Sequence, residues 1–224
     1  MTHTTLRMPF MPMGWGLAVA ALTACAPALN WREVRPTQAD GLVALFPCKP
    51  DAVQRDIVLP GLPDAVTMHL LSCEADGQRW VLSHLRVADV AQVPQALRAL
   101  ASATRGNLEA ATRSAGKGRT PSTSQDGPAK TAPHEVDRQV EASELPPVGV
   151  PRMTPQPDAR TWRFEALRPG DGAGPSVPLS VTASHFSHGL TVFQASVWQA
   201  GEAASAHSGR EAVTTFLQGF HFPG

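Results

Sequence analysis

Short apolar runs that end at proline or glycine set the strongest limit on what this chain can fold into. Four of them come first, at residues 41–46, 55–59, 65–74 and 79–85. Runs of this length, bounded by turn residues, are typical of β-strands rather than helices. Asp76-Gly77 separates the last two runs, and this dipeptide favours a two-residue hairpin turn because both positions need positive φ. The first half of the chain is therefore predicted to form antiparallel strands.

Side-chain alternation predicts which face of each strand is buried. The 65–74 run divides into two faces, with Val66, Met68 and Leu70 on one and His69, Leu71 and Cys73 on the other. Further strands are expected at 134–142, 160–166, 177–187 and 190–198. Trp162, Phe164 and Ala166 are expected to point inward. His188-Gly189 is predicted to join the last two strands as a second hairpin.

Two helices are predicted. Pro94–Arg105 carries proline in its first turn and is expected to end at Gly106. Near the C-terminus, Ser208 as N-cap and Glu211 at the third helical position fit a capping box. The stripe that follows consists of Val213, Phe216, Leu217 and Phe220. A stripe at this spacing predicts that the helix packs on a sheet.

These elements predict an α+β fold, an antiparallel β-sheet of about 7–9 strands with a mid-chain and a C-terminal helix packed on it. The expected organisation is a signal peptide at 1–24, a lipidated tether at 25–30 and a single α+β domain at 31–222.

Proline and glycine make up about 17% of the chain, above the ~12% background, which favours long loops. A mobile loop is expected near 107–133, and its basic residues suit either an anionic envelope surface or simple solvation. Residues 145–158 are expected to be a proline-rich connection.

The first 24 residues differ from the rest of the chain. Arg7 is the one charged side chain before an apolar run, and 14–24 is far shorter than the ~20 residues of a membrane-spanning helix. A short apolar core behind a positive charge predicts a secretory signal peptide. Leu22-Thr23-Ala24-Cys25 resembles the lipobox of bacterial lipoproteins. That resemblance implies cleavage after Ala24 and acylation of Cys25 by fatty acids such as palmitate.

A lipoprotein of this kind is held in the cell envelope by lipid on Cys25. One acyl chain anchors marginally, whereas two or three bind durably. Ala26 rather than Asp follows the cysteine, which favours the outer membrane facing the periplasm, while the inner membrane and the cell surface stay open. An ordinary cleaved leader that happens to precede a cysteine is the alternative.

Two cysteines, Cys48 and Cys73, remain after lipidation. In an exported protein such a pair is expected to form a disulfide. Closing this loop contributes about 3 kcal/mol in the chain-entropy model. A redox pair or metal ligands are the rival interpretations, although the chain has no Cys-x-x-Cys motif.

The sequence carries no nucleophile elbow, phosphate-binding loop or His-Glu-x-x-His motif. His185 and His188 stand three apart, which places them on opposite faces of a strand, whereas His69 and His84 belong to different strands and can approach in space. Ser83 beside His84 points to the other face. No catalytic residue, metal site or cofactor is therefore predicted. With 19 basic and 19 acidic side chains, no nucleic-acid partner is expected either.

The order of the elements resembles a known domain family, the PsbP-like sandwich, over residues 31–222. The resemblance rests on Phe46-Pro47 after a short strand, the hairpins, the mid-chain helix, the 177–198 hairpin and the closing segment 216–220. It extends to uncharacterised bacterial lipoproteins with such a domain. In photosynthetic members the domain is an accessory subunit that helps to retain cofactors of a membrane complex. No metal-binding residue of the family can be matched here, so that role is not carried over.

The functional hypothesis is a non-enzymatic, lipid-anchored envelope protein with an accessory or binding domain. Its expected partners are the membrane lipid, through acylated Cys25, and an envelope protein. One alternative is an envelope hydrolase or metal-dependent enzyme that gathers its histidines in space. Another is a structural spacer in a larger complex.

Overall fold

The computed structural model describes residues 28–114, 140–170, 174–205 and 207–224. The strands are β1 (Arg32–Val34), β2 (Val43–Phe46), β3 (Asp51–Ile57), β4 (Val66–Ala75), β5 (Gln78–Arg86), β6 (Glu141–Leu145), β7 (Thr161–Arg168), β8 (Val177–His188), β9 (Thr191–Ala200) and β10 (Phe220–His221). The helices are a 3₁₀ turn at Val90–Gln92, α1 (Val93–Ser114), α2 (Glu202–Ser205) and α3 (His207–Gln218). No helix within these ranges combines the length and the apolar character needed to cross a membrane.

The strands form two sheets in the described part of the chain. Seven strands make the larger sheet, in the order β3-β4-β5-β9-β8-β7-β6, and β1-β2-β10 make a smaller one. Every paired neighbour is antiparallel. The predicted α+β class, with an antiparallel sheet covered by a mid-chain and a C-terminal helix, is confirmed.

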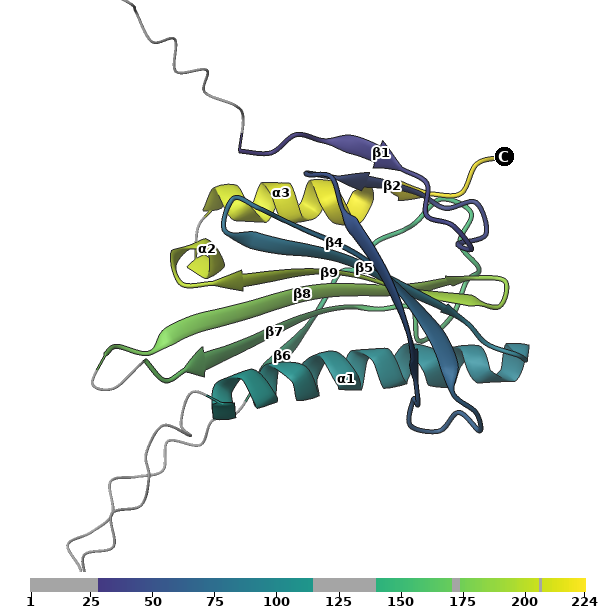
Figure 1. Cartoon of the computed structure of the whole chain (residues 1–224), viewed down its shortest axis with the longest axis horizontal. Helices are drawn as coiled ribbons and strands as arrows, with labels where there is room; N and C mark the ends of the chain where they lie inside the picture. The colour runs from purple at the N-terminus through teal and green to yellow at the C-terminus, as the bar shows by residue number, and fades with distance from the viewer. Residues whose placement is uncertain (1–27, 115–139, 171–173, 206) are drawn as a thin grey trace, which may run out of the picture.

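Both faces of the central strands of the large sheet are buried, one under α1 and the other under α3 and the small sheet (Figure 1). Strand β4 shows how the sequence serves both layers. Met68 packs in the α1 cluster, whereas Leu71 and Cys73 pack in the cluster that contains Phe216 of α3. The predicted division of this strand into two faces is therefore confirmed. Trp162, Phe164 and Ala166 of β7 likewise share one cluster with Leu108 of α1.

Aromatic rings fill the layer between the large sheet, α3 and the small sheet. Phe216 contacts Phe46 and Trp80 edge to face, with ring centroids 5.3 Å apart in both pairs. Trp80 is fully buried, and its indole nitrogen donates to the carbonyl oxygen of Ala75 at 3.2 Å. Such pairs stabilise a core beyond the area they bury. They hold the C-terminal helix on the sheet.

Both predicted hairpins are present. Asp76 and Gly77 have φ of 53° and 67° between the paired residues Ala75 and Gln78, as a type I′ turn requires. In the second hairpin His188 pairs with Thr191. The two-residue connection is therefore residues 189–190, one position later than predicted.

The predicted disulfide is confirmed. Cys48 follows β2 and Cys73 lies in β4, with their Cα atoms 6.0 Å apart. The bond ties the small sheet to the large one. Since both sheets contribute to the same core, this link joins two layers that already pack together.

The predicted end of the first helix at Gly106 is wrong. Helix α1 continues to Ser114, so residues 107–114 are helical, and the rest of the predicted 107–133 loop lies outside the described residues. The reason is that the buried stripe continues past the glycine. Leu108 is buried against β7 and β8, and Thr112 is buried one turn later. Packing overrides the weak helix propensity of glycine.

Four other boundaries differ from the prediction. The third strand is Asp51–Ile57 rather than 55–59, because Leu59 turns inward to the α1 cluster. Helix α3 begins at His207, so Ser208 lies within the helix and is not its N-cap. Phe220 is buried as predicted but belongs to β10. Of the predicted strand 134–142, Glu141 and Ala142 belong to β6, while 134–139 lie outside the described residues.

Gly106 offers a direct test of the helix extension. A Cβ atom built at this position meets nothing within 4 Å. Gly106→Ala is therefore expected to raise the free energy of unfolding by about 0.5–1 kcal/mol, the difference in helix propensity. Urea denaturation followed by circular dichroism measures it. The matched control is Gly219→Ala, which is expected to destabilise because its Cβ would lie 2.5 Å from that of Leu45. Lower stability of the Gly106 variant would contradict the extended helix.

Candidate functional site

Two of the four candidate histidines meet on the large sheet. His69 of β4 and His84 of β5 occupy directly opposite positions in the antiparallel pair. Their rings stack at a centroid distance of 4.9 Å and an interplanar angle of 12°. Alternation places both on the face that carries Leu71, Cys73 and Trp80. The pair therefore extends the aromatic layer toward the end of the sheet where β5 finishes.

His84 is buried without a hydrogen-bond partner. Its side chain is almost fully enclosed, and neither Nδ1 nor Nε2 contacts a donor or acceptor among the described residues. Phe193 of β9 packs on the other side of the ring, with centroids 5.8 Å apart. A buried polar group left unpaired costs about 1–3 kcal/mol. A cost of this kind marks His84 as a residue whose role is not stability.

The surroundings keep His84 neutral. Its pKa is lowered from 6.5 to about 4, chiefly because burial removes water from the charged ring. A charge on His69 would lower it further, and the carboxylate of Asp40 opposes both effects. At neutral pH the imidazole therefore presents one donor and one acceptor and carries no charge.

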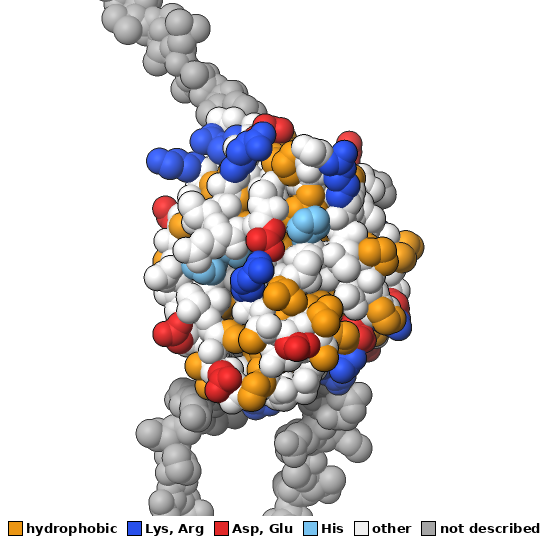
Figure 2. Space-filling model, turned by 90° about the vertical axis from the view of Figure 1, so that its right-hand side faces the viewer, with side chains coloured by type: hydrophobic (Ala, Val, Ile, Leu, Met, Phe, Trp, Pro, Cys, Tyr) orange, Lys and Arg blue, Asp and Glu red, His pale blue; other side chains and the backbone are white. Residues whose placement is uncertain are grey.

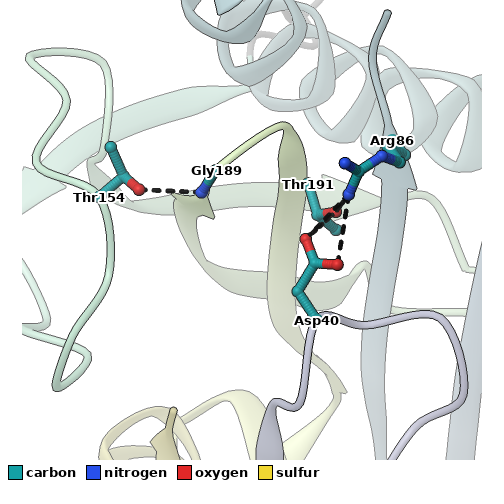
Figure 3. A network of polar contacts seen from close by, with 5 residues as sticks. All are labelled: Asp40, Arg86, Thr154, Gly189 and Thr191. Carbon is teal, nitrogen blue, oxygen red and sulfur yellow. Dashed lines mark hydrogen bonds and ion pairs between the residues drawn. The ribbon is translucent and has the colours of Figure 1, made fainter.

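A polar network lies next to the histidine pair. The Arg86 guanidinium donates through Nη1 to both carboxylate oxygens of Asp40, at 3.3 and 3.2 Å, and the Thr191 hydroxyl donates to Asp40 Oδ2 at 2.6 Å (Figure 3). Asp40 comes from the segment before β2, whereas Arg86 and Thr191 are paired across β5 and β9. The network therefore fastens the 38–41 segment to the end of the large sheet.

The backbone of that segment is unusual. Gln38 and Asp40 have φ of 59° and 47°, and Gly41 follows at 80°. Left-handed conformations are unfavourable for residues with a side chain, although Asp tolerates them better than most. The three bonds of Asp40 compensate for this strain. Across the same end of the molecule, the amide of Gly189 donates to Thr154 Oγ1 at 2.9 Å (Figure 3).

A cavity of about 540 Å³ opens beside the two histidines. We call it the histidine cavity. Its polar wall includes Gln38, Thr67, His69, His84 and Arg86, and its apolar wall includes Leu62, Val66, Val87 and Leu190. A second hollow of about 250 Å³ shares the same two histidines. On this end of the molecule, acidic, basic and histidine side chains lie side by side among apolar ones (Figure 2).

The other two histidines lie elsewhere. His185 contacts Gln194 and the carbonyl oxygen of Arg160 through its two ring nitrogens, at 3.1 and 3.3 Å. Gln194 in turn contacts Thr104 of α1, which places His185 on the opposite face of the sheet. Burial also lowers the pKa of His185 to about 4. The fourth, His188, stacks on Phe222, and its Nδ1 lies 2.9 Å from the carbonyl oxygen of Arg152.

The histidine pair is built as a wall rather than as a cage for a metal. In-plane lone pairs of stacked rings run side by side and do not converge on one point. Among the described residues, no group of three or more His, Cys, Asp or Glu side chains is placed to hold a metal ion. What the arrangement does is place a buried imidazole with unpaired nitrogens and a guanidinium at the wall of the same hollow.

Sequence reasoning found part of this site. The sequence left open that His69 and His84 approach in space, and in the structure they stack. The Asp40–Arg86–Thr191 network was missed, because its members stand 46 and 105 residues apart and share no motif. One local signal existed: Asp40-Gly41 is a turn dipeptide just before a strand. Cys25 lies outside the described residues.

No protein-family model matches the chain, and no curated protein matches its sequence.

Replacing His84 tests whether its unpaired nitrogens destabilise the fold. His84→Phe keeps a flat ring against Phe193 and removes both nitrogens. We expect the free energy of unfolding at pH 7.5 to rise by about 1 kcal/mol, the removed penalty less some overpacking. The control is His185→Phe, a site as deeply buried whose nitrogens do have partners, where stability should fall. Chemical denaturation compares the two, and equal losses would contradict the assignment.

The same histidines predict how stability depends on pH. Their pKa values are near 4 in the folded protein and 6.5 when unfolded. Below pH 6.5 the unfolded chain therefore binds protons that the native state does not, so stability falls as pH drops from 6.5 to 4. Each histidine contributes up to about 1.4 kcal/mol per pH unit. A plot of the free energy of unfolding against pH across this window should be flatter for His84→Phe than for the unaltered protein. Parallel curves would contradict the lowered pKa of His84.

Proposed function

We propose that this chain is a lipid-anchored cell-envelope protein whose α+β domain is a non-catalytic binding module. The observation that carries the anchor is the four-residue lipobox, Leu22-Thr23-Ala24-Cys25, at the end of a short apolar run. Acyl chains on Cys25 would hold the protein at the outer membrane, facing the periplasm. The membrane lipid is then its first partner and an envelope protein its second.

The disulfide supports export. Cys48–Cys73 is an internal bond of the folded domain, and such bonds persist in oxidising compartments.

The direction of the chain bears on how an anchored domain would be oriented. The first described residues enter at the end of β1 remote from the β8–β9 hairpin (Figure 1). A protein anchored through residue 25 would thus turn the hairpin end, with the histidine cavity, away from its tether.

The cavity supports a binding role. Ligand sites are hollows of about 300–1,000 Å³ with mostly apolar walls and a few placed polar groups. The histidine cavity has this size and this mixture of walls. That the domain is PsbP-like remains a proposal. It rests on the order of hairpins, mid-chain helix and C-terminal helix over residues 31–222.

The second candidate is an envelope enzyme that uses gathered histidines. The observation that favours it is the contact between His69 and His84. It would require the stacked rings to turn and a third ligand to join them. Zinc titration by calorimetry separates the two candidates, because tight stoichiometric binding that is lost in His69→Ala would favour the enzyme.

The anchor is tested on the protein from its own membranes. Intact-mass analysis is expected to show a chain that begins at Cys25 and carries fatty acyl groups. Cys25→Ser should abolish the modification. The variant should then no longer be found in the membrane fraction, from which detergent releases the acylated protein. Cys48→Ser is the matched control and should remain acylated. An unmodified chain that begins at another residue would contradict the proposal.

A further inference from the structure

The histidine cavity contains hydrogen-bonding capacity that the protein itself does not use. Both ring nitrogens of His84 lack partners among the described residues. Arg86 is the next residue after His84 on the same face of β5. Within the described part of the chain, it donates hydrogen bonds to Asp40 and Thr191 through Nη1 alone. Its Nε and Nη2 remain as donors at the cavity wall. A buried imidazole and an unfilled guanidinium fork therefore border one hollow.

We propose that this cavity binds the carboxylate of a small organic acid with an apolar tail. The carboxylate would accept from the Arg86 fork and from the His84 ring, because charge-assisted bonds to planar guanidinium groups suit planar carboxylates. The tail would lie against Leu62, Val66, Val87 and Leu190. This inference rests on the proposed binding function and names its ligand class.

The same geometry argues against a shared cation. The two rings lie within 12° of parallel, so a metal between them would sit outside both ring planes. A positive ion would also approach the Arg86 guanidinium, which lines the same cavity. An anion meets neither obstacle. It supplies the acceptor that the buried imidazole lacks.

Binding of this kind is coupled to a proton. A carboxylate beside His84 favours its charged form and so offsets the loss of water around the ring. Among the residues that the structure describes, the other charged or titratable groups that face the site are His69 of β4, Arg86 of β5, Asp40 of the 38–41 segment and Asp64 of the β3–β4 connection. Asp40 competes with the ligand for Arg86. Affinity is therefore expected to rise as pH falls.

The test is calorimetric titration of the full chain, kept in detergent, with hexanoate at pH 6.0 and pH 7.5. The heat of diluting hexanoate into the same detergent buffer without protein is subtracted. Hexanoate should bind one to one and at least about threefold more tightly at the lower pH, as uptake of part of a proton requires. Three further titrations use 1-hexanol, acetate and inorganic phosphate. The alcohol lacks the charge, acetate lacks the tail, and phosphate is an oxyanion of different shape. All three should bind at least tenfold more weakly than hexanoate.

Variants assign the residues. Arg86→Met should weaken hexanoate binding at least tenfold at both pH values, whereas Arg79→Met, at the exposed far end of the same strand, should change nothing. His84→Phe should remove the pH dependence. Asp40→Asn should tighten binding, because asparagine tolerates the left-handed backbone and, without the negative charge, competes less strongly for Arg86.

Three results would overturn the ligand class: no binding of hexanoate, equal binding of hexanol, or binding of phosphate in preference to hexanoate. Unchanged affinity in Arg86→Met would overturn the site. Each of these outcomes leaves acylation of Cys25 intact, since intact mass reports on it separately. Loss of acylation with hexanoate binding retained would overturn the anchor and leave the cavity assignment standing.

Discussion

The burial of both faces of one antiparallel sheet is the constraint on which the rest of this structure depends. A sheet with one wet face needs a single apolar set of side chains, but this one must supply two. In β4, Met68 packs toward α1, while Leu71 and Cys73 pack toward α3 and the small sheet. A one-residue slip in register would exchange the two sets. The Asp76-Gly77 turn, with both residues at positive φ, fixes that register between β4 and β5.

The histidine site arises where one of the two covering layers thins out. Trp80 lies on the same face of β5 as His84, nearer the start of the strand, and the ring of Phe216 of α3 packs against it. His84 is instead covered by the stacked ring of His69, with the 38–41 segment fastened nearby through Asp40. Side chains at this margin are enclosed but not close-packed, which leaves a hollow. A residue that would be apolar in the centre of the layer is here a histidine with unsatisfied nitrogens.

Local chemistry explains which elements could be predicted. Both hairpins have glycine in the turn, and alternation in 65–74 and 160–166 identified the buried faces. The end of α1 could not be predicted, because Gly106 is a stop signal only when nothing beyond it packs. Leu108 packs on strands that follow some 60 residues later. The limits of β3 and α3 were missed for the same reason, since the tertiary contacts of Leu59 and the start of α3 at His207 have no local marker in the sequence.

In the site, strand register brings the two histidines together. Asp40 reaches Arg86 through a long-range contact that no sequence spacing predicts.

The disulfide has a consequence for how copies of this chain meet one another. Strand β3 forms one edge of the large sheet and is exposed along nearly its whole length. Exposed edges are where chains exchange strands or stack into fibres, and charged residues such as Arg55 and Asp56 discourage this. The Cys48–Cys73 bond encloses β3 in a covalent ring together with most of β4. A strand held in such a ring has no free end to thread into a neighbour. Domain swapping through this edge is therefore blocked by connectivity, and it stays blocked for as long as the bond is oxidised.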